Sequence, residues 1–210
     1  MFDRRHVLNF YWFYDLPFGP GQKWSTGNWA DKVFGGWYNA GIVTASSGSP
    51  VCVYTFANYG ALTGTNSSCA IPIRGTNFGN SVHKSAGSGG IGTNGDPAEG
   101  GSGLNLYANP EAVFNNFRFP LMTRDTRFGF GVLRGLPRWN LDLSLGKRTA
   151  ITESVKLALG FDFINVLNHR ELNDPTNDFN LDLTNPTAFG VFTSQFGSPR
   201  TIQFGFRVEF

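Results

Sequence analysis

The last ten residues alternate strictly between apolar and polar side chains, and this alternation constrains the fold more than any other feature of the chain. One set of alternate positions is apolar: Ile202, Phe204, Phe206, Val208 and Phe210. The intervening set is Thr201, Gln203, Gly205, Arg207 and Glu209. A period of two places successive side chains on opposite sides of a β-strand. The segment predicts a strand with one apolar face, which by itself fits a half-buried strand of a soluble sheet better than a membrane strand.

Two adjoining segments, 137–147 and 151–167, repeat the pattern around a predicted turn at 148–150. Their apolar positions are Trp139, Leu141, Leu143 and Leu145, then Val155, Leu157, Leu159, Phe161 and Phe163. Their opposite positions are Asn140, Asp142, Ser144 and Gly146, then Lys156, Ala158, Gly160 and Asp162. A soluble protein would cover such an apolar face with a helix or a second sheet. No segment shows a convincing helical period of 3.6 residues that could supply the cover, so we expect the apolar face to meet lipid.

Two further strands are predicted near the start of the chain, at 6–16 and 35–47. In the first, Leu8, Phe10, Trp12, Tyr14 and Leu16 alternate with a second set that also contains aromatics. In the second, either Tyr38, Ala40 and Ile42 or Trp37, Gly41 and Val43 could face outward. The fifth strand is 200–210. The connections alternate between shorter ones (17–34 and 148–150) and long polar ones (48–136 and 168–199), as in barrels with short periplasmic turns and long extracellular loops.

The predicted fold is therefore all-β: residues 1–210 form the C-terminal segment, about five antiparallel strands, of a large transmembrane β-barrel in the outer membrane. Residues 48–136 form a long extracellular loop within it, and 56–119 are left without assigned secondary structure. Aromatic residues and charged residues each make up 15% of the chain, against about 25% charged in ordinary domains. No apolar run approaches the ~20 residues of a membrane helix. The net charge of +2 gives no reason to expect nucleic acid as a partner.

The first residues of the chain and its two cysteines give two further expectations. The first residues, Met1 to His6, lack the apolar core of a signal peptide, and we expect the true N-terminus to be missing. Cys52 and Cys69 could form a disulfide in an oxidising compartment or remain as free thiols, and the sequence favours neither.

Several motifs that could carry chemistry fail on context, and we predict no enzyme, no cofactor and no metal. Residues 87–92 match GxGxxG but lie in a glycine-rich run that predicts a flexible loop. Asp178, Asn180 and Asp182 copy the start of an EF-hand loop without its glycine and glutamate, so a solvated acidic turn is favoured over a calcium site. The three histidines, at 6, 83 and 169, lack ligand spacing.

The polar positions of the predicted strands are candidates for the barrel lumen. They are Asn140, Asp142, Lys156, Asp162, Gln203, Arg207 and Glu209, with Asn9 and Asp15 from the first strand. They either hydrogen-bond one another or a plug domain in a water-filled interior, which we favour, or line a path for a substrate.

Segments spread over most of the chain resemble the C-terminal part of the barrel of TonB-dependent receptors. These segments are Phe2-Asp3-Arg4-Arg5-His6-Val7-Leu8-Asn9, Gly36-Trp37 with Gly41-Ile42-Val43, Ser47-Gly48-Ser49-Pro50, Arg134-Gly135, Trp139 to Leu145, Phe163-Ile164-Asn165-Val166-Leu167-Asn168-His169, Phe196-Gly197-Ser198-Pro199-Arg200 and Ile202-Gln203-Phe204-Gly205. The most similar subgroup is the Oar-like receptors, which carry a carboxypeptidase-regulatory-like domain and are common in acidobacteria.

This resemblance implies a barrel of about 22 strands, an N-terminal plug and a box that contacts TonB, with an unknown scarce small ligand taken up across the outer membrane. Partners would be outer-membrane lipid, the missing strands and plug, TonB, and the barrel-assembly machinery. The residues Ile202, Phe204, Phe206, Val208 and Phe210 resemble the signal which that machinery recognises. Two alternatives stay open: a non-transporting adhesion or signalling barrel, and a soluble secreted β-sandwich that buries Phe204 against Leu143.

Overall fold

The computed structural model describes residues 3–25, 27, 29–55, 69–84, 90–121, 124–125, 129, 131–152, 154–175 and 180–210. The chain divides into two compact units. One comprises Val7–Ala45, Trp139–Arg170 and Gly197–Phe210, and we call it the sheet unit. The other comprises Met1–His6, Ser46–Arg138 and Glu171–Phe196, and we call it the loop unit. In the described part of the chain, no helix has both the length and the apolar character needed to cross a membrane.

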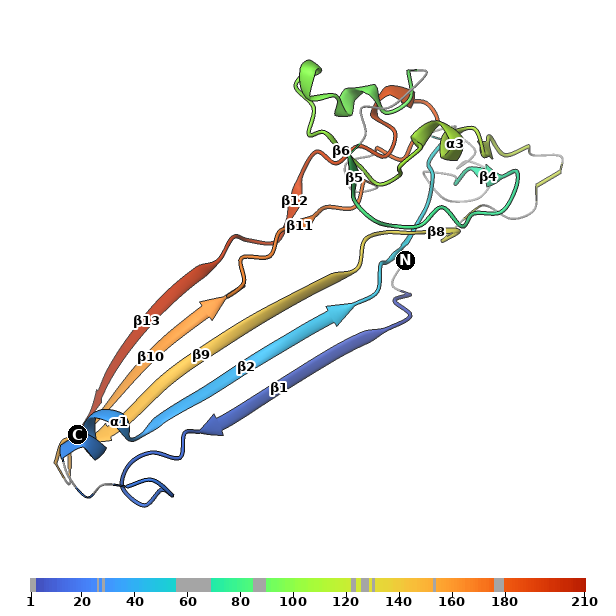
Figure 1. Cartoon of the computed structure of the whole chain (residues 1–210). Coiled ribbons are helices and arrows are strands. Elements are labelled where there is room, and N and C mark those ends of the chain that lie inside the picture. The colour runs from blue at the N-terminus through green and yellow to red at the C-terminus, as the bar shows by residue number, and fades with distance from the viewer. Residues whose placement is uncertain are drawn as a thin grey trace. The chain divides into compact units, whose positions relative to one another are not determined.

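The sheet unit is built on one sheet of five long strands, in the order β1-β2-β9-β10-β13 (Figure 1). The strands are β1 (Val7–Asp15), β2 (Trp37–Ser46), β9 (Arg138–Ala150), β10 (Lys156–Ile164) and β13 (Thr201–Glu209). β10 pairs antiparallel with both of its neighbours. The order of the strands in space equals their order along the chain, so every strand lies beside the long strand that precedes it.

The register carries each face of the sheet from strand to strand. Phe161 of β10 lies opposite Leu145 of β9 and Phe204 of β13, and Gly160 lies opposite Gly146 and Gly205. Opposite residues in a sheet point to the same side. The alternation predicted within single strands therefore becomes an apolar face and a polar face, and beyond Leu145 the apolar face carries Lys147 and Thr149, opposite Leu159 and Leu157.

Backbone hydrogen bonds extend the same faces to β1 and β2. The Leu16 N–H donates to the Trp37 carbonyl at 2.8 Å, and the Arg148 N–H donates to the Gly36 carbonyl at 2.8 Å. This register places Trp37, Gly41 and Val43 on the apolar face, which decides between the two facings that the sequence left open. Gly41 has no room for a Cβ because the ring of Trp12 lies over it.

The hairpin turn predicted at 148–150 is wrong. β9 continues to Ala150, and the chain turns only beyond it, where the Ile151 N–H donates to the Val155 carbonyl at 2.9 Å. The polar run beginning at Lys147 indicated a turn, but β2 offers Arg148 a backbone partner, so the strand goes on. β1, β2 and β13 agree with their predicted ranges to within two residues at each end, whereas β10 begins five residues later and ends three residues earlier than predicted.

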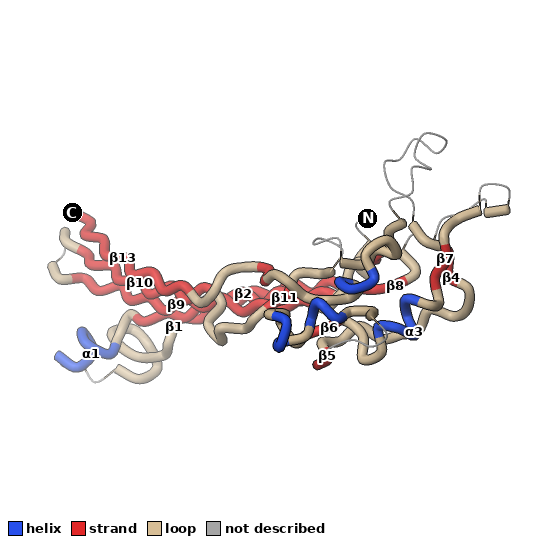
Figure 2. Tube along the Cα trace, turned by 90° about the horizontal axis from the view of Figure 1, so that it is seen from above, coloured by secondary structure: helices blue, strands red, loops and turns tan. Residues whose placement is uncertain are grey.

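The loop unit is made of short elements that pair in twos (Figure 2). The antiparallel pairs are β3 (Pro50–Val51) with β8 (Leu133–Arg134), β4 (Ile71–Pro72) with β7 (Phe117–Arg118), β5 (His83–Lys84) with β6 (Leu104–Asn105), and β11 (Glu171–Leu172) with β12 (Gln195–Phe196). The helices are η1 (Thr93–Gly95), η2 (Pro97–Glu99), α3 (Pro110–Phe114) and η3 (Pro186–Ala188). α3 begins where the side chain of Asn109 accepts from the Ala112 N–H at 3.0 Å and Pro110 fixes the first turn.

A hydrophobic core joins the two long connections, although they are far apart in sequence. Val53, Leu106 and Tyr107 from the first connection are buried with Leu181 and Phe189 from the second. Both stretches looked like polar loops in the sequence, because their apolar residues follow neither a period of two nor one of 3.6. Of the flexible loop predicted at 87–92, residues 87–89 lie outside the described residues. The prediction is wrong for the rest, because Ile91 packs against the core and the Gly92 N–H donates to the Pro186 carbonyl at 2.8 Å. Beyond them, η1 and η2 follow.

Cys52 and Cys69 form a disulfide, with their Cα atoms 5.6 Å apart. Both residues are buried, at 5% and 0% exposure. The bridge closes a sequence separation of 17, and closing a loop of that size stabilises a fold by on the order of 3 kcal/mol. The structure thus decides between the bridge and the free thiols, and the bridge is fixed against the core of the loop unit.

Candidate functional site

The polar face of the sheet gathers all nine strand residues that the sequence marked as candidates for the lumen, Asn9 and Asp15 of β1 included. The register sets Lys156 opposite Glu209 and Asp162 opposite Gln203. Arg207 pairs with Glu209 at 3.1 Å along β13. On the neighbouring strands, the Asn140 amide donates to Asp142 at 2.8 Å and the Ser144 hydroxyl donates to Asp162. The polar face therefore carries charges and amides that bond to one another.

Aromatic side chains continue this face on the other two strands. Tyr38 of β2 lies over Gly146, which has no room for a Cβ. The ring of Phe13 stacks on Tyr38 with centroids 5.2 Å apart, and the guanidinium of Arg148 lies 5.0 Å from the Tyr38 ring. The polar face is thus ionic on β9, β10 and β13 and aromatic on β1 and β2. Alternation alone did not reveal this division, because the cross-strand neighbours of Tyr38 were not fixed.

The apolar face of the sheet is exposed in the part of the chain that the structure describes. The residues proposed as an assembly signal on β13, Ile202, Phe204, Phe206, Val208 and Phe210, are between 43% and 100% exposed. Phe161 of β10 contacts Phe204 of the adjacent strand β13, with ring centroids 5.0 Å apart. The β-sandwich alternative is therefore wrong, because Phe204 and Leu143 belong to one sheet and Phe204 is 64% exposed.

A short helix follows β1 and borders the apolar face. α1 (Trp29–Phe34) lies in the connection between β1 and β2, which the sequence indicated only as a turn. Asp31 ties the residues before the helix to it, because its carboxylate accepts from the Ser25 hydroxyl at 2.6 Å and from the Gly27 N–H at 2.9 Å. At its other end, the Lys147 ammonium donates to the carbonyls of Lys32, Val33 and Gly35. A lysine at this end satisfies carbonyls that the helix leaves free.

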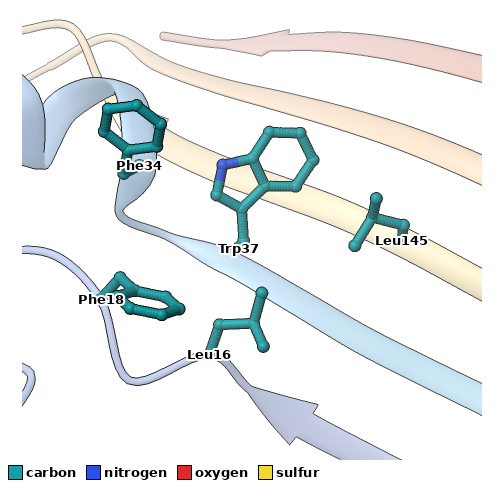
Figure 3. A pocket seen from close by; sticks show the side chains of 5 residues that line it. All are labelled: Leu16, Phe18, Phe34, Trp37 and Leu145. Carbon is teal, nitrogen blue, oxygen red and sulfur yellow. The ribbon is translucent and has the colours of Figure 1, made fainter.

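An apolar pocket of about 470 Å³ opens beside this helix. Figure 3 shows its lining: Leu16, Phe18, Phe34, Trp37 and Leu145. Trp37 and Leu145 come from the adjacent strands β2 and β9, Leu16 directly follows β1, and Phe34 ends α1. No pattern in the sequence indicates this pocket, because the pocket depends on how the connection between β1 and β2 brings Phe18 and Phe34 beside the strands.

The EF-hand-like residues and the histidines that the structure describes do not come together as a metal site. Asn180 and Asp182 are buried, at 7% and 4% exposure, so the solvated acidic turn predicted for them is wrong. Asp182 accepts from the N–H and the hydroxyl of Thr184, and Asn180 donates to the Val191 carbonyl; Asp178 lies outside the described residues. His169 stacks on Trp139 at 4.1 Å. Among the residues that the structure describes, no three His, Cys, Asp or Glu side chains cluster as metal ligands would.

Ion pairs in the loop unit hold its segments together. Asp174 is buried and accepts from the Leu136 N–H at 2.9 Å, with Arg138 at 3.4 Å. Asp125 pairs with Arg118 at 2.6 Å, and this hydrogen bond lowers the pKa of the Asp125 carboxyl to about 2. Burial raises the pKa of Tyr107 far above its usual range. These groups organise segments that have little regular secondary structure.

An antiparallel sheet with an uncovered apolar face, a polar face and strands of nine residues or more defines membrane-spanning β-structure of the outer-membrane type. The chain belongs to the outer membrane beta barrel domain family, whose model matches residues 1–203. The protein is accordingly an outer-membrane protein. Comparisons with curated proteins and with solved structures found no match.

Proposed function

We propose that the chain is the C-terminal part of the barrel of a TonB-dependent outer-membrane receptor, which takes up a scarce small ligand. The observation that carries this is the five-stranded sheet, in which β1 and β13 each pair on one side only among the described residues. Lipid cannot hydrogen-bond the backbone groups of an open edge, so a membrane sheet must close into a barrel. The closing strands would come from a preceding part of the same protein, in a barrel of about 22 strands.

The alternation of connections supports an orientation for these strands. The connections β1–β2 and β9–β10 leave from the end of the sheet where β13 ends, and both connections through the loop unit leave from the opposite end (Figure 1). Barrels place their short turns at the periplasm. We therefore assign α1 and Phe210 to the periplasmic side and the loop unit to the extracellular side, where a ligand would first be met.

The polar face would then line the lumen. Its carboxylates and cations already bond within the sheet, as Arg207 does with Glu209. We expect them to hydrate the interior and to hold a plug domain, which a TonB-dependent receptor carries. A more specific form of this proposal is that the ligand passes along the same polar face.

The experiment that tests the proposal uses the complete protein encoded by the gene. The upstream reading frame should encode a plug and a TonB box. We expect the purified protein to bind the periplasmic domain of TonB from the same bacterium, and deletion of the box to abolish binding. A matched control deletes an equal number of residues from the linker after the box. A complete protein without plug and box would contradict the proposal and favour the adhesion or signalling barrel.

That second function has an observation of its own. The loop unit has a buried core and a disulfide, so it can present a fixed surface to a partner outside the cell. A folded extracellular unit serves adhesion as well as uptake, and binding to TonB separates the two functions.

We also propose that β13 is read by the barrel-assembly machinery, through Phe210. This residue follows β13 and is fully exposed, so Phe210→Ser removes no packing contact within the described sheet. We expect it to slow assembly in cells, measured as the rate at which the complete protein becomes heat-modifiable. Glu209→Gln, one position away on the polar side, is the control. Equal assembly rates for the two variants would contradict a role of Phe210 as a signal.

A further inference from the structure

The connection between β1 and β2 folds back onto the apolar side of the sheet. Its residues Phe18 and Phe34 line the apolar pocket together with side chains of the apolar face (Figure 3). The indole N–H of Trp37, which belongs to that face, donates to the Val33 carbonyl of α1 at 3.2 Å. α1 therefore lies against the side of the sheet that meets lipid, and not against the side of the lumen.

A lysine of the apolar face holds α1 in this place. Lys147 lies opposite Leu159 of β10, on the side that meets lipid, yet it is only 9% exposed. Its ammonium donates to the carbonyls of Lys32 at 2.8 Å and Gly35 at 3.0 Å, and it lies 5.3 Å from the Trp37 ring. A cation exposed to hydrocarbon is costly. The bonds that satisfy Lys147 therefore also keep the helix on the lipid side.

The apolar face continues beyond the level at which Lys147 holds α1. Leu159 lies opposite Lys147 on one side and opposite Phe206 of β13 on the other. Two residues nearer the end of the sheet where β13 ends, Leu157 lies opposite Val208. Phe206 and Val208 are both exposed, so the surface that meets lipid extends past this level. The outward side of α1 is continuous with that surface.

The outward side of α1 is itself apolar. Trp29 and Val33 are four residues apart and share one face of the helix, and Trp29 is 74% exposed. Phe34 at the end of the helix and Trp24 before it are also exposed, and so is Lys32. Exposed aromatics beside a lysine are typical of a helix that lies at the boundary between hydrocarbon and headgroups.

We propose that the β1–β2 connection is a membrane anchor, in which α1 inserts Trp29, Val33 and Phe34 into the periplasmic leaflet at the level of the headgroups. The inference rests on the proposed orientation of the sheet, and it adds a contact with the membrane that the barrel strands do not make themselves. Such an anchor fixes the depth of the periplasmic end of the barrel and keeps Lys147 covered.

The test places a nitroxide spin label on single cysteines of the complete protein in lipid vesicles, after any free cysteine has been replaced by serine. Trp29→Cys puts the label on the outward side of α1. Phe206→Cys is the reference for lipid, and Glu99→Cys, on an exposed residue of the loop unit, is the reference for water. Electron paramagnetic resonance compares collisions with oxygen, which concentrates in lipid, and with a water-soluble nickel chelate. We expect the labels at residues 29 and 206 to favour oxygen and the label at residue 99 to favour the chelate.

A label at residue 29 that favours the chelate would overturn the inference. A label shielded from both reagents would also overturn it, because it would indicate a protein partner on α1. Heat-modifiability checks that each variant folds, and Val33→Cys on the same helix face replaces Trp29→Cys should that variant not fold. TonB binding is measured on the same samples. If it persists while the label at residue 29 reports water, the anchor alone is wrong. If it is absent while that label reports lipid, the anchor stands and the proposed receptor function fails.

Discussion

Replacing Phe161 with arginine should destabilise the complete barrel by about 2–4 kcal/mol, the cost of a cation on the lipid face near the bilayer midplane. Phe161 lies near the middle of β10, opposite Leu145 and Phe204, on the apolar face. Urea unfolding of the barrel in lipid vesicles measures the free energy of unfolding directly. Each 1.4 kcal/mol lost lowers the folded-to-unfolded ratio about tenfold.

Two controls separate the effect of lipid from that of lost packing. Ala158→Arg adds the same cation three residues earlier on the polar face, opposite Arg148 and Arg207, where water can solvate it. Phe161→Ala removes the contact with Phe204 without adding a charge. We expect Phe161→Arg to be the most costly of the three. If Ala158→Arg cost as much, the assignment of the two faces to lipid and lumen would have to be reversed or abandoned.

The second large effect concerns the 210-residue chain expressed alone. We expect it not to form a heat-modifiable monomer in detergent or vesicles, whereas the complete protein should do so. The reason is the pair of open edges: within the described residues β1 and β13 each pair on one side only. Every backbone group left unpaired in hydrocarbon costs several kcal/mol. Electrophoresis with and without heating distinguishes a folded barrel from an unfolded chain.

The control is the complete protein carrying the same tag and refolded in the same vesicles. Assembly of the isolated chain into a multimer that closes its own edges would agree with the physical argument, because edge strands pair with any available partner. A folded monomer of the isolated chain would refute it, and with it the inference that further strands complete the barrel.

Local patterns in the sequence predicted the long strands well. The alternation in 200–210 and 151–167 located β13 and β10 because a period of two is a property of a strand by itself. Prediction failed where a boundary depends on a neighbour. Lys147 indicated a turn, yet β9 continues past it because β2 offers Arg148 a hydrogen-bond partner and the carbonyls of α1 bind the Lys147 ammonium.

The candidate site likewise has one part that the sequence predicted and one part that it did not. The sequence placed the polar residues of β9, β10 and β13 on one face, and the register brings them together as Lys156 opposite Glu209 and Asp162 opposite Gln203. It did not predict the pocket between Leu16, Phe34 and Leu145. Those residues are 129 positions apart at most, and no periodic signal connects them.

By itself, then, the sequence determined the strands and their two faces, because side-chain alternation follows from backbone geometry within one segment. The tertiary structure alone decided the facing of Trp37, the Cys52–Cys69 bridge, the core shared by Leu106 and Phe189, and the pocket under α1. Each of these depends on contacts between segments that are distant in the chain. Such contacts form only when the whole fold has placed both partners.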